Sequence, residues 1–109
     1  MTNKTVNKET QLSGQASADQ IAMWKKLHRD VFEVKATDKM CYLKRPDRQT
    51  LKVAEAVGKE DAMRYSEIVL ENCWLGGDEE IKTNDLYFLE VLPTLEELVD
   101  YGRAEIKKL

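Results

Sequence analysis

The sequence predicts an α+β fold, with a small β-hairpin near the N-terminus and a mostly helical C-terminal part. A β-branched and aromatic run at 31–36, turn residues and a second apolar run at 40–43 form the pattern of a hairpin. From residue 46 onward, apolar residues recur at helical spacing behind capping residues. The 109 residues correspond to one domain, which we expect to span residues 17–109.

Residues 1–16 are almost entirely polar. Such a segment cannot bury enough apolar surface to offset its ordering entropy, so we expect a flexible tail. The first helix is expected to begin after Ser17, because Ser17 and Gln20 form a capping box. An apolar stripe follows at helical spacing, made of Ile21, Trp24 and Leu27.

The hairpin is expected to place Phe32, Val34 and Ala36 on one face of its first strand. A hairpin alone is marginally stable, so it must pack on helices or on another copy of itself. An edge strand can also accept a strand from a neighbouring subunit. The residues predicted to lie at such an oligomer edge are Phe32, Val34, Met40 and Tyr42.

Two capped helices are predicted next. Asp47 is the expected N-cap of the first and Gly58 its expected C-cap. Asp61 is the expected cap of the second, which we predict to finish with Trp74 and Leu75 before the double glycine at 76–77 stops it.

A polar link at 78–83 is predicted to precede a long final helix, capped by Thr83 or Asn84. Its apolar line is expected to continue to the end of the chain, through Leu86, Leu89, Leu92, Leu95, Leu98, Val99, Ile106 and Leu109. Pro93 either kinks this helix or begins a separate one, and the sequence does not decide between the two.

The net charge of −3 divides unevenly along the chain. Residues 1–45 carry nine basic and five acidic side chains, whereas residues 46–109 carry eight and fifteen. The basic half makes a small DNA-associated accessory protein the alternative function. The cations form no continuous run and the isoelectric point is about 5.2, so nucleic acid is not the favoured partner.

No catalytic, metal or cofactor site is predicted. Cys41 and Cys73 stand alone and are expected to be reduced and buried, and His28 is the only histidine. The double glycine lacks the Lys-Ser/Thr of a phosphate-binding loop and is followed by three acids. The acids between 78 and 100 lack the spacing of a calcium loop and are expected to form a solvated helix face. No membrane-spanning run and no signal peptide are predicted.

Several segments resemble the tail assembly chaperones of long-tailed bacteriophages and prophages. They are the strand end YLKRPDR at 42–48, the helix end at 54–58, the run NCWLGGDE at 72–79 and the closing IKKL at 106–109. The order of elements is also similar, and the resemblance covers about residues 17–109.

The resemblance implies a non-enzymatic protein of the host bacterial cytoplasm that is not part of the mature virion. It implies binding to the largely helical tape-measure protein. The chaperone keeps that protein soluble until tail-tube subunits replace the chaperone. Self-association is a further expectation. Many of these families also make a longer product by ribosomal frameshifting, so a longer form of this chain is another candidate partner.

The closing Leu-rich helix supplies the candidate partner-binding surface, because helix-in-groove binding needs an apolar stripe. The residues predicted for it are Leu86, Tyr87, Phe88, Leu89, Leu92 and Leu95. Tyr87 and Phe88 point about 100° apart on a helix, so we expect one of them to face a partner or a second packing surface.

Overall fold

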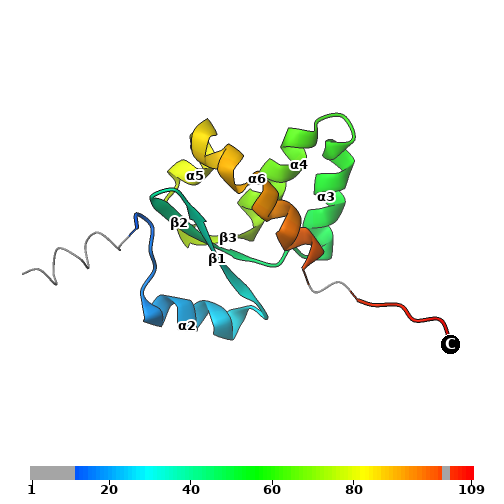
Figure 1. The fold of residues 1–109 in the computed structure, drawn as a ribbon, viewed down its shortest axis with the longest axis horizontal. Helices are drawn as coiled ribbons and strands as arrows, with labels where there is room; N and C mark the ends of the chain where they lie inside the picture. The colour runs from blue at the N-terminus through cyan, green and yellow to red at the C-terminus, as the bar shows by residue number, and fades with distance from the viewer. Residues whose placement is uncertain (1–11, 102–103) are drawn as a thin grey trace, which may run out of the picture.

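The computed structural model describes residues 12–101 and 104–109, and it has an α+β fold. The elements run, in chain order, as α2 (Ala18–Leu27), β1 (Val31–Ala36), β2 (Lys39–Lys44), α3 (Arg48–Gly58), α4 (Ala62–Cys73), β3 (Trp74–Gly77), α5 (Glu80–Thr83) and α6 (Asp85–Asp100). The strands form one antiparallel sheet in the order β1-β2-β3. Helix α2 lies on one side of this sheet and α3 to α6 lie on the other (Figure 1).

The third strand corrects the sequence prediction, which had placed Trp74 and Leu75 in a helix. Helix α4 ends at Cys73, and three of the next four residues, Trp74, Gly76 and Gly77, pair with β2. Gly77 makes this pairing possible, because its φ of 134° and its approach to Cys41 leave no room for a side chain. An added Cβ at Gly77 would lie 2.4 Å from the Cα of Cys41. The double glycine therefore belongs to a strand and does not form a helix cap.

Strand β2 is central and is buried on both faces. Cys41 and Leu43 face the larger core, formed with α3 to α6, while Met40 and Tyr42 face a smaller core against α2. In the smaller core, the ring of Trp24 lies 5.3 Å from that of Tyr42. Alternation along a strand sends neighbours to opposite faces, and here each face has its own helical layer.

The predicted oligomer edge is therefore wrong for its β2 residues. Met40 and Tyr42 are only 5% and 1% exposed, because β3 and α2 cover them. On β1, Val34 is buried in the larger core and Phe32 is half-buried against it. In the described part of the chain, no strand pairs with the outer edge of β1.

Residues 12–16 of the expected tail lie along the sheet. Ser13 forms a bridge with Lys39, and the backbone N–H of Ala16 donates to the hydroxyl of Tyr42 at 3.1 Å. Leu12 and Ala16 pack against the smaller core. This order comes from tertiary partners that the polar composition does not reveal, and residues 1–11 lie outside the described residues.

The predicted helix N-caps are confirmed. The side chains of Ser17, Asp47 and Asp61 each accept a hydrogen bond from the backbone N–H three residues later in the chain, at 2.8–3.1 Å. The side chain of Asn84 accepts one from the backbone N–H two residues later, at 3.0 Å. Gly58, by contrast, is the last residue of α3 rather than its cap, and Lys59 follows it as the C-cap. The close approach of Tyr65 to Gly58 explains the glycine, since an added Cβ would lie 3.0 Å from the Cβ of Tyr65.

Helix α6 is continuous through Pro93 and ends at Asp100, so the predicted extension to Leu109 is wrong. Its buried face is formed by Phe88, Val91, Leu95 and Leu98. Successive steps of three residues drift by about 60° around a helix, so the leucines at every third position wind around α6. Only alternating steps of three and four keep a residue on the core side. In the residues that the structure describes, no helix is long and apolar enough to cross a membrane.

Candidate functional site

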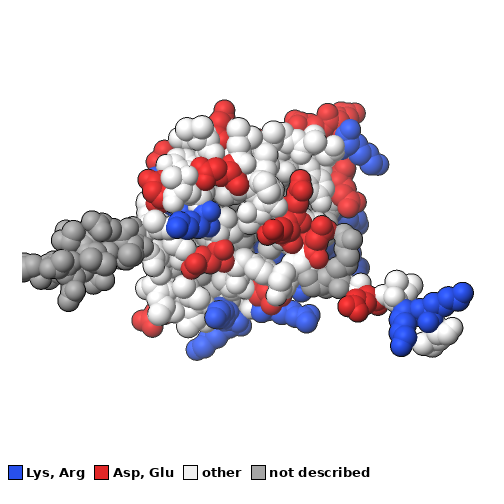
Figure 2. Space-filling model, in the orientation of Figure 1, with Lys and Arg blue, Asp and Glu red and all other residues white. Residues whose placement is uncertain are grey.

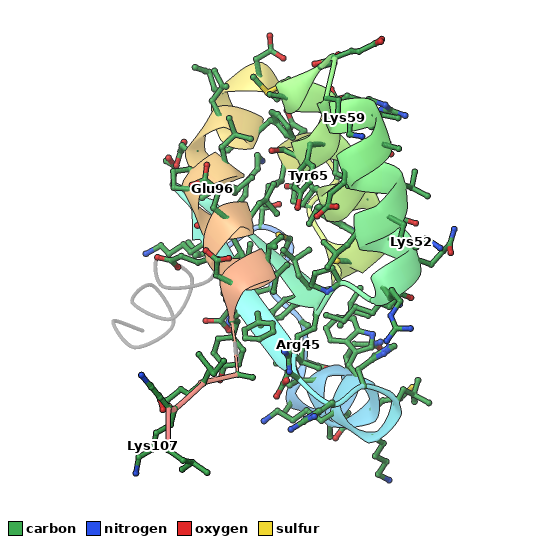
Figure 3. The ribbon with its side chains drawn as sticks, turned by 90° about the vertical axis from the view of Figure 1, so that its right-hand side faces the viewer. Arg45, Lys52, Lys59, Tyr65, Glu96 and Lys107 are labelled. Carbon is green, nitrogen blue, oxygen red and sulfur yellow. The ribbon has the colours of Figure 1, made fainter. Side chains whose placement is uncertain are left out.

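An open groove lies between α4 and α6, on the side of these helices away from the sheet's hairpin turn. We call it the α4–α6 groove, and its volume is about 450 Å³. Helix α6 lines it with Leu95, Glu96, Val99 and Asp100, and α4 with Ala62, Tyr65, Ser66 and Val69. Figure 3 shows Tyr65 and Glu96 on the two helices that border it.

Small residues leave this space open. Gly58 ends α3, and Ala62 and Ser66 follow one turn apart on the wall formed by α4. Their short side chains do not reach α6, so the space above Val69 and Leu95 is unfilled. Val69 and Leu95 are themselves buried and form an apolar floor.

Helix α6 extends the apolar surface beyond the groove. Leu89, Leu92, Glu96 and Val99 follow steps of three, four and three residues, which places them along one side of the helix. Leu92 and Val99 are half-buried, whereas Leu89 is 52% exposed. Leu89, Leu92 and Val99 therefore form an apolar strip along one side of α6, about three turns long and interrupted by Glu96.

The rim of the groove is acidic. Glu96 and Asp100 come from α6, and Tyr65 stands opposite on α4. Burial raises the pKa of Tyr65, and the carboxylates of Glu55 and Asp100 raise it further. Lys52 projects from α3 on the side away from α6 in Figure 3, so it does not offset these charges at the groove.

The structure separates the six predicted partner-binding residues into three groups. Leu86 and Leu89 are 73% and 52% exposed, and Leu92 is half-buried beside the groove. Leu95 lies in the groove floor. Tyr87 and Phe88 serve other contacts and do not lie on this strip.

Phe88 is buried in the larger core. Tyr87 packs against the edge of the same core and also contacts the hairpin, where its hydroxyl donates to Asp38 at 2.9 Å and the Nζ of Lys39 lies 5.2 Å from its ring. Both aromatic residues therefore pack against the same core, and the expectation that one of them faces a partner stays a prediction. Sequence reasoning missed the wall residues Tyr65 and Ser66, for which the small residues Gly58 and Ala62 were the available signal.

Among the described residues of the basic half, two cations are held in ion pairs. Lys39 is bound to Asp78 and Glu80 at 3.0 and 3.3 Å, and Arg45 to Asp30 at 3.2 Å. In Figure 2, basic side chains gather at the α2 end of the visible face, while acidic ones are spread over the helical layer above. Two of the cations considered for nucleic-acid binding are therefore held in internal ion pairs.

Cys41 and Cys73 are free and buried, as predicted, and burial raises their pKa values to about 12 and about 11. In the described ranges, no group of three His, Cys, Asp or Glu side chains is placed to hold a metal ion. The α4–α6 groove and the strip beside it are the best candidate for a functional surface.

Comparisons with known proteins give no match to this chain, whether with protein-family models, curated proteins or solved structures.

Proposed function

We propose that this protein is a phage tail assembly chaperone, a non-enzymatic protein that binds and solubilises the tape-measure protein before the tail tube polymerises. The supporting observation is the α4–α6 groove, continued along α6 by Leu92 and Leu89. The tape-measure protein is proposed as the binding partner because residues 17–109 resemble these chaperones. The protein acts during assembly in the host and is released afterwards.

The groove suits a helical client. An amphipathic helix binds a hydrophobic groove through apolar residues at one-turn spacing, and the strip on α6 presents its own side chains at that spacing. Leu89, Leu92 and Val99 offer such contacts over about three turns.

The groove also suits a temporary client. It is open rather than enclosed, and much of the strip remains partly exposed to water. Contacts of this kind are individually weak, so competing tail-tube subunits are able to displace the client. Acidic side chains such as Glu96 keep the exposed apolar surface soluble.

Co-expression with a tape-measure protein tests this proposal. We expect the two proteins to co-purify and the tape-measure protein to be less soluble when expressed alone. Leu89→Asp is expected to abolish co-purification while leaving the fold intact. Met23→Asp is the matched control, because Met23 is 57% exposed on α2, across the sheet.

Equal solubility of the tape-measure protein with and without this chain would contradict the proposal. The alternative, a DNA-associated protein, predicts a salt-dependent shift of duplex DNA that is lost when Lys25 and Lys26 are both changed to Glu. Such a shift, together with failed co-purification, would favour the alternative.

A further inference from the structure

The residues at 106–109 carry a short apolar and basic sequence that nothing in the fold covers. Ile106 and Leu109 are fully exposed, and Lys107 and Lys108 lie between them. Residues 104–109 run away from the body of the domain (Figure 1). We call residues 106–109 the C-terminal segment. Two fully exposed aliphatic side chains with two adjacent cations are well suited to an apolar site with an acidic rim.

The α4–α6 groove has this complementary chemistry. Its floor is formed by Val69 and Leu95, and its α6 rim carries the exposed carboxylate of Glu96. A volume of about 450 Å³ accommodates aliphatic side chains. Ile106 and Leu109 are three residues apart, so one helical turn would place both on the same side, with the lysines flanking them.

We propose that the C-terminal segment of one copy docks into the α4–α6 groove of a second copy. Ile106 and Leu109 contact the apolar floor, and the two lysines lie beside the acidic rim. The charges and the apolar surfaces of the two partners match without any change in the body of the domain.

The contacts of Tyr101 favour docking of the C-terminal segment into the groove of a second copy over docking into the groove of its own chain. The ring of Tyr101 packs edge-on against Phe32 at 4.8 Å, and its carbonyl accepts from Nη2 of Arg45 at 3.0 Å. Both contacts lie on the β1 side of α6, whereas the groove lies on its α4 side. Figure 3 shows Lys107 beyond the end of α6, far from Glu96 and Tyr65.

Docking of this kind is heterologous, because a segment on one copy binds a different surface on the next. Such contacts generate a ring when the rotation closes and an open chain when it does not. The segment also occupies the groove that the client would need, so client binding would release neighbouring copies from one another. This last consequence rests on the proposed function, whereas the docking itself does not.

Sedimentation velocity of the full chain, without any client, tests the docking. We expect the sedimentation coefficient to rise with protein concentration and to fall with salt. Ile106→Ser with Leu109→Ser is expected to weaken association at least about tenfold, and so is Glu96→Lys. Met23→Ser and Lys25→Glu with Lys26→Glu are the matched controls, and both should associate like the unaltered chain.

A mixing experiment identifies the two surfaces directly. Glu96→Lys and the double variant Lys107→Glu, Lys108→Glu are each expected to associate at least about tenfold more weakly than the unaltered chain when alone. Mixed, they should associate more strongly, because the acidic segment of the double variant no longer meets Glu96 in the groove of the Glu96→Lys variant. The unaltered segment of the first also fits the unaltered groove of the second.

Three outcomes would overturn the proposal. They are a monomer at every concentration, association that the segment variants do not weaken, and a mixture that associates no more strongly than either variant alone. Docking within one chain predicts the first of these. None of the three would affect the co-purification test with Leu89→Asp, so the two proposals fail separately.

Discussion

The Nζ of Lys39 lies 3.0 Å from Oδ2 of Asp78, and this ion pair joins the start of β2 to the residue that follows β3. Asp78 also accepts from the hydroxyl of Ser13 and from the backbone N–H of Glu80. One carboxylate therefore connects the N-terminal segment, the sheet and the start of α5. The side chains of Lys39 and Asp78 are only 12% and 16% exposed, so the ion pair is largely shielded from water.

This arrangement predicts how stability changes in acid. The hydrogen bond from Ser13, with those from Glu80 and Lys39, lowers the pKa of Asp78 from 3.8 to about 2. The ionised Asp78 therefore contributes its full stabilisation above the pKa that it has in the unfolded chain. This stabilisation is lost as the pH falls through the lower pKa of Asp78 in the folded protein. Urea unfolding should show a loss of stability between about pH 4 and pH 2 that Asp78→Asn reduces.

The same variant should also be less stable at neutral pH, because Lys39 and Ser13 lose a charged partner. Glu60→Gln is the control, since Glu60 is an exposed carboxylate between α3 and α4. An unchanged acid profile in Asp78→Asn would show that the carboxylate does not contribute to this transition.

Gly77→Ala is expected to be strongly destabilising. The new Cβ would lie 2.4 Å from the Cα of Cys41 and 2.5 Å from the carbonyl oxygen of Met40, in a backbone conformation with φ of 134°. Neither backbone atom can move without breaking the pairing of β2 with β3. We expect a loss of at least about 2 kcal/mol in urea unfolding.

Gly76→Ala is the graded comparison for this change. Its added Cβ would meet only the ring of Trp24, at 2.9 Å, and φ there is not in the left-handed region. A side-chain ring is able to shift, so the loss of stability should be smaller. Equal effects of the two variants would contradict the assignment of Gly77 to the close backbone approach.

Leu89→Asp and Val91→Asp should behave oppositely, although they lie two residues apart. Leu89 is half exposed beside the groove, so its replacement should change the free energy of unfolding by less than about 1 kcal/mol. Val91 is buried in the larger core, and an unpaired charge there should prevent folding. Circular dichroism and urea unfolding check both outcomes, and a folded Val91→Asp would contradict the observed orientation of α6.

The two cysteines should react slowly in the folded protein. Burial raises the pKa of Cys41 to about 12 and that of Cys73 to about 11, so almost no thiolate is present at neutral pH. A thiol reagent should modify both residues only as the protein unfolds, with a rate that increases with urea. Rapid modification without denaturant would contradict their burial.

The sequence alone determined the local features of this protein. The N-caps at Ser17, Asp47 and Asp61 were predictable because each cap involves atoms three residues apart. The hairpin was predictable for the same reason, since its strands are joined by a two-residue turn. The α+β class follows from these local patterns.

The tertiary structure decided everything that depends on distant partners. Gly77 pairs with Cys41, 36 positions earlier in the chain, and this pairing turns a predicted helix end into a strand and β2 into a central strand. The α4–α6 groove depends in the same way on how far Leu95 stands from Val69 and on the short side chains between them. Periodicity reports which residues share a face, but it does not report which face finds a partner, because that depends on how the elements pack.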